Sequence, residues 1–176
     1  MGTGKSTAGH LAAAQLGFKF LDTDELIEAH VGKPIPRIFA EDGEEAFRRF
    51  EREVAEELAH QRKTVIATGG GLGANAALLE GLKRHSLVVC LWASPEQIWE
   101  RVRHQAHRPL LQVPDPLERI RELLAQREPV YRQADVLVNT GYRQSREVVQ
   151  QLLFHFHLAS RTRPPRDERE NPIPGA

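Results

Sequence analysis

The feature that most constrains this chain is its first segment, Met-Gly-Thr-Gly-Lys-Ser-Thr over residues 1–7. Its Gly-Lys-Ser triplet is the distal half of the pattern G-x-x-x-x-G-K-[ST], in which backbone N–H groups and a helix N-terminus surround a chain of phosphates. In that arrangement Lys5 contacts the β- and γ-phosphates, and the Ser6 hydroxyl ligates the Mg²⁺ that bridges them. The alternative is a Gly-rich turn before an ordinary helix, because a match to a short motif is only a hypothesis.

The composition of the chain limits its size, its partners and its compartment. A length of 176 residues with 40% hydrophobic content fits one compact domain. The 24 basic and 24 acidic side chains balance, which gives no overall attraction to nucleic acid or to an anionic membrane. Cys90 is the only cysteine, so an intrachain disulfide is excluded and a reducing compartment is favoured. The sequence has neither an apolar run long enough for a bilayer nor a signal-peptide pattern, so we expect a soluble, cytoplasmic protein.

Apolar segments typical of strands alternate with segments typical of helices along the chain. Such alternation predicts an α/β fold in which a mostly parallel sheet is covered by helices on both faces. The proline-rich stretch 104–116 is expected to form a lid, because long loops in compact domains are usually functional. From residue 160 onward we expect a disordered tail, which leaves a domain of residues 1–159. The predicted strands are 18–22, 64–68, 87–92 and 136–139, and the main predicted helices are 7–15, 25–31, 43–61, 74–84, 95–104, 117–126 and 145–157.

Aspartates follow the first predicted strand, and glycines follow the second. Asp22 and Asp24 end the first strand, at the edge where open α/β sheets hold their ligands. The alternative for Asp24 is that it only caps the next helix, a common role of aspartate. Glycines 69–71 follow the second strand and leave bare N–H groups for a ligand, although a flexible turn would have the same sequence.

The helix predicted at 43–61 has a capping signal and a charged face. Asp42, with Glu45 three residues later, reads as a capping box. The arginines and glutamates of this helix are interpreted as a solvated, salt-bridged surface.

Taken together, these segments resemble the shikimate kinase family of P-loop kinases. The resemblance extends over about residues 1–153, with the motifs in the family's order. Gluconate kinases and adenylate kinases share the P-loop but not this set of motifs. The segments that carry the resemblance are Gly2-Thr3-Gly4-Lys5-Ser6-Thr7, Leu21-Asp22-Thr23-Asp24, Ile38-Phe39 with Gly43-Glu44 and Phe47-Arg48-Arg49, Thr68-Gly69-Gly70-Gly71, Arg108-Pro109-Leu110-Leu111 and Arg127-Glu128-Pro129-Val130-Tyr131.

The resemblance implies a fold, a reaction and a pathway. The implied fold is P-loop NTPase-like with three layers, and the family's sheet has five strands. The implied reaction is ATP-dependent phosphorylation of the 3-hydroxyl of shikimate, which yields shikimate 3-phosphate and ADP in aromatic amino-acid (chorismate) biosynthesis. The implied cofactors are ATP and Mg²⁺, and we expect a monomer without a nucleic-acid or membrane partner.

The resemblance also implies roles for individual residues. Asp24 would hold ring hydroxyls and orient or deprotonate the nucleophile, and Arg108 would close over the phosphates from the lid. The implied catalytic residues are Lys5, Asp24 and Arg108; the nucleotide-binding residues are Gly2, Thr3, Gly4, Lys5, Ser6, Thr7, Arg101, Arg108 and Arg143; the shikimate-binding residues are Asp24, Arg48, Gly69, Gly70, Gly71 and Arg127; and the Mg²⁺ ligands are Ser6 and Asp22.

Two features depart from the family pattern. Asn139 stands where the family usually has aspartate, which bears on the adenine loop but not on the chemistry. The first glycine of the P-loop pattern, and the strand before it, would lie upstream of Met1. Because that strand is in the middle of the family's sheet, its loss would leave unpaired edges on both neighbours. We therefore expect the natural protein to begin upstream, and the chain alone to be unstable or inactive.

Two other functions are open at this point. A related small-molecule kinase, such as one that phosphorylates gluconate, would use the same P-loop. A truncated, non-catalytic nucleotide-binding module would also keep it. The second function is disfavoured because a non-catalytic protein has no physical need for all five of these residues: Lys5, Asp24, Arg48, Arg108 and Arg127.

Overall fold

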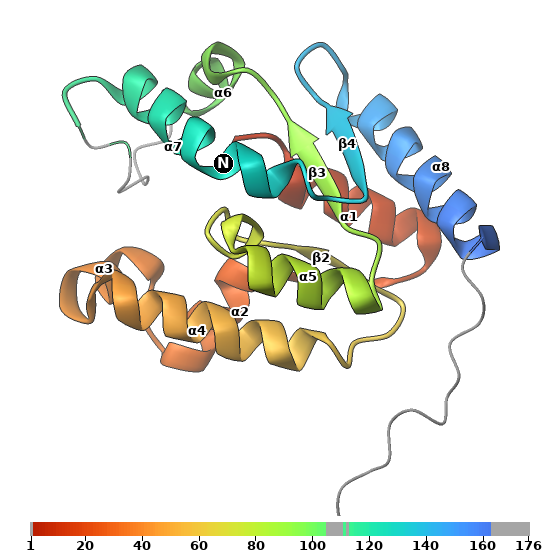
Figure 1. Ribbon diagram of the computed structural model, residues 1–176, viewed down its shortest axis with the longest axis horizontal. Helices are drawn as coiled ribbons and strands as arrows, with labels where there is room; N and C mark the ends of the chain where they lie inside the picture. Colours follow the sequence, from red (N-terminus) through yellow and green to blue (C-terminus); the bar gives the residue numbers. More distant parts are fainter. Residues whose placement is uncertain (1, 105–110, 112, 163–176) are drawn as a thin grey trace, which may run out of the picture.

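The computed structural model describes residues 2–104, 111 and 113–162, and in it helices alternate with strands along the chain (Figure 1). The α/β fold expected from the sequence is confirmed. The strands are β1 (Lys19–Asp22), β2 (Thr64–Ala67), β3 (Val89–Trp92) and β4 (Val136–Asn139). The helices are α1 (Lys5–Leu16), α2 (Thr23–Val31), α3 (Ile35–Glu41), α4 (Gly43–Leu58), α5 (Ala76–His85), α6 (Pro95–Val102), α7 (Pro116–Tyr131) and α8 (Ser145–Thr162), with a short 3₁₀ helix, η1 (Leu72–Ala74).

The strands form two parallel pairs rather than one continuous sheet. β1 pairs with β2, with Asp22 opposite Ala67, and β3 pairs with β4, with Trp92 opposite Asn139. Within the described residues each strand has a single strand neighbour.

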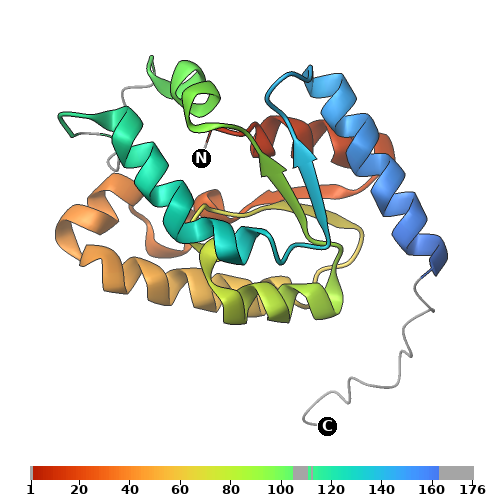
Figure 2. The same cartoon turned by 45° about the horizontal axis from the view of Figure 1, so that its top comes forward.

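Helix α1 connects the two strand pairs. Its Ala8 and Ala12 pack with Val138 of β4 in one core cluster, to which α8 also contributes. Gly9 lies so close to Phe20 of β1 that a Cβ there would overlap the ring. Figure 2 shows α8 beside β4, with α1 passing behind the strands. The small residues of α1 therefore allow close packing against both pairs.

Helices α2, α3 and α4 surround a second core cluster. Ile27 of α2 and Ile38 of α3 are fully buried in it. They pack with Phe47, Val54 and Leu58 of α4, which recur at helical spacing on one face of that helix. A third cluster joins α6 to α7. Together, the three clusters pack the helices and strands that border the site described below.

Helix α7 is longer than predicted. The amphipathic pattern predicted a helix over residues 117–126, and a proline such as Pro129 disfavours a helix interior by about 3 kcal/mol. The structure instead continues the helix through Pro129 to Tyr131. Contacts of α7 with α6 and η1 are the tertiary packing that overrides the local preference. Arg127 and Tyr131 consequently lie one turn apart on the same helix.

Other predictions at helix ends are corrected too. The Asp42 side chain caps nothing in α4; both its oxygens accept hydrogen bonds from Lys33 Nζ, at 2.9 and 3.1 Å. Helix α8 continues to Thr162, past the predicted domain boundary at residue 159. Residues 163–176 of the expected tail, and most of the expected lid including Arg108, lie outside the described residues. None of the described helices is long and apolar enough to cross a membrane.

Candidate active site

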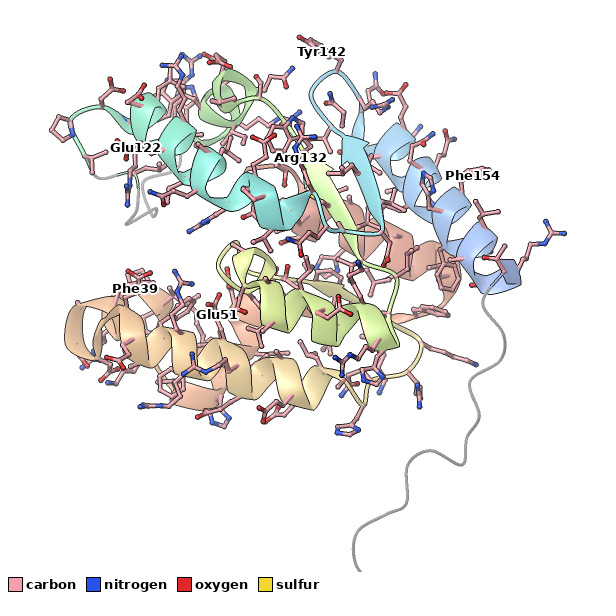
Figure 3. The ribbon with its side chains drawn as sticks, in the orientation of Figure 1. Phe39, Glu51, Glu122, Arg132, Tyr142 and Phe154 are labelled. Carbon is pink, nitrogen blue, oxygen red and sulfur yellow. The ribbon has the colours of Figure 1, made fainter. Side chains whose placement is uncertain are left out.

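One pocket of about 1100 Å³ brings together the predicted site residues that the structure describes. Its walls come from the start of α1, the end of β1, α4, the glycine segment after β2, α6, α7 and the residues after β4. Figure 3 shows Phe39 and Glu51, which also line the pocket, on the side of α3 and α4 that faces α7. The predicted residues in the lining are Gly2, Thr3, Gly4, Lys5, Ser6, Thr7, Asp22, Asp24, Arg48, Gly69, Gly70, Gly71, Arg101, Arg127 and Arg143.

The start of α1 provides an anion site in this pocket. Gly4 precedes the helix with a φ of 83°, a left-handed conformation that residues with a side chain rarely adopt. Lys5 is the first residue of α1, and the first turn contains no acidic side chain. The N–H groups of this turn and the positive end of the helix dipole therefore favour an anion such as a phosphate.

Asp22, and not Asp24, is the cap of helix α2. Its Oδ1 accepts a hydrogen bond from the backbone N–H of Asp24 at 3.0 Å. Its Oδ2 accepts a hydrogen bond from the Ser6 hydroxyl at 2.7 Å. The alternative in which Asp24 is only a helix cap is therefore wrong, and the Asp24 carboxylate lines the pocket.

The pKa of the Asp24 carboxyl is raised above its ordinary value. Burial, together with the charge of Asp22, raises this pKa from 3.8 to about 6. Lys5 acts in the opposite direction, while Glu51 and Glu28 add smaller upward effects. A carboxylate accepts a proton more readily near neutral pH when its pKa is closer to that pH. Asp24 therefore combines a position in the pocket with raised basicity.

Two glutamates of α4 hold Arg48 in place. Arg48 Nη1 donates to Glu51 Oε2, and Nη2 donates to Glu44 Oε1, both at 2.7 Å. The Glu51 side chain is only 3% exposed, and its Oε1 has no hydrogen-bond partner among the described residues. The sequence interpretation placed these glutamates on a solvated surface and missed Glu51. Its spacing of three residues from Arg48 was the available signal.

The glycine segment fits between these groups because it has no side chains. A Cβ on Gly69 would lie 2.5 Å from Asp24 Oδ1, and one on Gly71 would overlap the Arg48 guanidinium. The N–H of Gly69 donates to Oγ1 of the fully buried Thr23. The N–H groups of the next two glycines have no acceptor within the described part of the chain. Those two donors, rather than that of Gly69, can serve a ligand.

Arg101 and Arg143 lie beside the residues that follow β4. Arg101 donates to the Thr140 carbonyl at 2.6 Å, to the Thr140 hydroxyl at 3.0 Å and to the Gly2 carbonyl at 3.4 Å. Arg143 donates to the carbonyl of Asn139. The Asn139 side chain accepts a hydrogen bond from the backbone N–H two residues later, at 2.8 Å. Arg101 thus connects the segment before α1 to the turn after β4.

The oxygen atoms beside Lys5 fit a magnesium ion. Ser6 and Asp22 present a hydroxyl and a carboxylate in hydrogen-bond contact, and Mg²⁺ prefers such oxygen ligands. No group of three or more His, Cys, Asp or Glu that could hold a metal occurs in residues 2–104, 111 and 113–162. Mg²⁺ in phosphoryl-transfer sites commonly takes one or two protein ligands and completes its shell with phosphates and water, which agrees with this donor set.

The pocket combines an anion site at a helix N-terminus with arginines and a carboxylate from distant segments. On a fold of parallel strands and helices, this combination defines a P-loop kinase. The chain belongs to the shikimate kinase family, since the family model described as shikimate kinase matches residues 1–156.

Individual relatives agree with this assignment. A shikimate kinase from Thermodesulfovibrio yellowstonii is 41% identical over 160 residues, which cover 91% of this chain and 92% of that protein. The solved structure described as shikimate kinase from Acinetobacter baumannii in complex with shikimate has a TM-score of 0.85 at 38% identity, covering 93% of this chain and 91% of that one. A gluconokinase structure from Sinorhizobium meliloti has a TM-score of 0.58 at 19% identity and covers 93% of each chain, so it shares the fold alone. The family predicted from the motifs is confirmed.

Proposed function

We propose that this protein transfers the γ-phosphoryl group of ATP to the 3-hydroxyl of shikimate, giving shikimate 3-phosphate and ADP, in aromatic amino-acid biosynthesis. The observation that supports this most is the presence of Arg48, Arg127 and Asp24 in the same pocket as Lys5. A small polyhydroxylated acid requires a fork-shaped cation at one end and a hydroxyl acceptor at the other. A related protein of the same fold is described in complex with shikimate.

Arg48 and Arg127 bind the carboxylate of the substrate in this proposal. A guanidinium pairs with a carboxylate through two parallel hydrogen bonds, and Glu44 and Glu51 already orient the Arg48 fork. The N–H of Gly71 is a further donor. With the acid end fixed, the ring presents a hydroxyl to Asp24, and positioning of this kind can account for several of the roughly 7–11 kcal/mol available from orientation.

Asp24 receives the proton of the attacking hydroxyl. Its pKa of about 6 leaves the carboxylate ionised at neutral pH, ready to accept a hydrogen bond from the 3-hydroxyl. As the oxygen–phosphorus bond forms, the O–H bond breaks and the proton passes to Asp24. The bond between the γ-phosphorus and the bridging oxygen breaks, and ADP leaves with that oxygen.

The nucleotide is bound at the other end of the pocket. Lys5 and the N-terminus of α1 neutralise the phosphates, while Arg101 and Arg143 flank the adenine. Mg²⁺, which Ser6 would bind directly and Asp22 through water, supplies further charge neutralisation on the phosphates when bound. The proposed contact of Arg108 with the phosphates rests on the family resemblance alone.

We assign this reaction to single copies of the chain in the cytoplasm. All the described residues proposed for the site line one pocket of one chain, so no second copy is needed to complete it. The single cysteine, Cys90, fits a reducing compartment.

The Arg48–Glu51 pair offers a test that separates stability from binding. Arg48→Met should destabilise the protein by about 3–5 kcal/mol, because it leaves the Glu51 carboxylate buried without a cation. The double variant Arg48→Met/Glu51→Leu should recover most of that stability, since apolar residues of similar volume tolerate burial. Both variants should bind shikimate more weakly than the unsubstituted protein, because both lack the Arg48 guanidinium. Urea unfolding and calorimetric titration measure the two effects, and a double variant as unstable as the single one would contradict the account of Glu51.

Coupled ADP-release measurements with different acceptors test the proposed function. ADP release that depends on shikimate and is lost in Lys5→Met is the expected result, with only background release on gluconate. Activity on gluconate without activity on shikimate would make the protein a gluconate kinase instead. Nucleotide binding without turnover on any acceptor would make it a non-catalytic module.

A further inference from the structure

Tyr131 lies behind the acid-binding part of the pocket and not in it. It is the last residue of α7, four positions after Arg127, so both side chains project from the same face of the helix. Arg127 lines the active-site pocket, whereas Tyr131 lines a separate cavity of about 90 Å³ bordered by the glycine segment and β3. The glycine segment therefore stands between the tyrosine and the substrate.

The Tyr131 hydroxyl donates a hydrogen bond to the carbonyl oxygen of Gly70 at 2.9 Å. Burial raises the pKa of this hydroxyl above its ordinary value, more than the nearby Arg127 lowers it. The hydroxyl therefore keeps its proton at neutral pH and remains a donor to Gly70.

The hydrogen bond to Gly70 controls the direction of the next N–H group. The Gly70 carbonyl and the Gly71 N–H belong to one planar trans peptide, in which they point in opposite directions; no cis peptide bond occurs among the described residues. Two adjacent glycines could otherwise rotate this peptide easily, because neither has a Cβ. With the carbonyl held behind the segment by Tyr131, the Gly71 N–H is directed away from it, toward the pocket that Gly71 lines.

Arg127 is positioned through the same contacts. A Cβ on Gly70 would lie 3.0 Å from Arg127 Nη1 and 3.8 Å from Tyr131 Oη. The Arg127 guanidinium thus lies next to the α carbon of Gly70, while the Tyr131 hydroxyl donates a hydrogen bond to the carbonyl oxygen of the same residue. A shift of Tyr131 or of the Gly70 peptide would therefore also displace the Arg127 guanidinium.

We propose that Tyr131 is a positioning residue for the substrate carboxylate, which it serves by fixing both the Gly71 N–H and the Arg127 guanidinium as donors. This inference rests on the proposed function, in which that carboxylate belongs to shikimate. Tyr131 itself does not touch the substrate. Loss of its hydroxyl should weaken the binding of the acid and leave nucleotide binding and the chemical step nearly unchanged.

Tyr131→Phe tests this proposal, because it removes the hydroxyl and keeps the ring. The KM for shikimate should rise roughly tenfold, the size expected for one lost hydrogen bond, while the KM for ATP and kcat stay within about threefold. Tyr142→Phe makes the same chemical change at a side chain whose residue is 93% exposed, and it should change none of these values. Thermal unfolding of both variants shows that the folded state is retained.

A substrate analogue separates positioning from a general structural role. In the analogue the carboxylate of shikimate is replaced by a primary alcohol, so the proposed donors lose their anionic partner. Tyr131→Phe should then leave kcat/KM for the analogue unchanged, whereas a loosened site would lower it as much as for shikimate. An unchanged KM for shikimate, or equal losses on both compounds, would overturn the role of Tyr131. A lack of shikimate phosphorylation by the unsubstituted protein would contradict the proposed function instead.

Discussion

Asp24→Asn should lower kcat by roughly 10²–10⁴-fold, the range for loss of a general acid–base group, and should at the same time stabilise the folded protein at neutral pH. The asparagine keeps the size of the side chain but cannot accept the proton of the substrate hydroxyl. The pH profile should change with it. In the unsubstituted enzyme kcat/KM should fall as the pH drops below about 6, where Asp24 is protonated; in the variant this dependence should be absent.

The gain in stability follows from the raised pKa of Asp24. Burial, together with the charge of Asp22, raises this pKa from 3.8 to about 6 in the folded state. The stability contributed by the protonated carboxyl is complete at low pH and is lost as the pH rises through about 6, because the folded protein must then hold a buried charge. A shift of about two units corresponds to about 3 kcal/mol.

Urea unfolding at two pH values measures this effect. Asp24→Asn should be more stable than the unsubstituted protein by up to about 3 kcal/mol at pH 7, and the difference should approach zero near pH 4. Glu57→Gln removes a carboxylate from an exposed position of α4 and should change neither stability nor activity. An Asp24→Asn protein that is fully active, or that is less stable at pH 7, would contradict the role given to Asp24.

Gly71→Ala should raise the KM for shikimate by about 100-fold, since a displacement of about 1 Å in a binding group can cost that much. A Cβ at this position would overlap the Arg48 guanidinium and lie 2.8 Å from Glu51 Oε1. Arg48 cannot retreat easily, because it is paired with the buried Glu51. The φ of −76° and ψ of −46° at Gly71 are open to alanine, so the expected effect comes from the lost space and not from the backbone.

Gly81→Ala is the matched control for this substitution. Gly81 lies within α5, and a Cβ there would meet nothing within 4 Å. Alanine should therefore stabilise the helix by about 1 kcal/mol without affecting the kinetics. Shikimate KM values compare the two variants directly. A Gly71→Ala enzyme with the KM of the Gly81→Ala enzyme would show that the glycine segment does not border the acid.

Much of the site could be predicted from the sequence because its residues fall at recognisable places. The Gly-Lys-Ser triplet opens a helix, Asp22 and Asp24 follow one strand, and the three glycines follow another. Each of these motifs determines its backbone conformation through neighbouring residues, so it can be recognised without knowledge of tertiary contacts. Knowledge of the family supplied the rest, since nothing in the spacing of Arg48 and Arg127 indicates that they line a common pocket.

What escaped prediction depends on tertiary contacts. Asp42 has the sequence of a helix cap, but its oxygens bind Lys33 instead. The amphipathic pattern predicted a helix only to residue 126, yet packing continues α7 through Pro129 to Tyr131. Glu51 looks like one more exposed glutamate of α4 and is nonetheless 3% exposed. In each case a partner distant in sequence, or the burial of a whole helix face, determines the outcome.

A crystal structure of the protein with shikimate, Mg²⁺ and a non-hydrolysable ATP analogue would test the central claim most directly. The account predicts the triphosphate at the N-terminus of α1, the shikimate carboxylate between Arg48 and Arg127, and the 3-hydroxyl about 2.6–3.2 Å from the Asp24 carboxylate. A shikimate molecule whose carboxylate lies away from both arginines, or whose 3-hydroxyl is out of reach of Asp24, would contradict it.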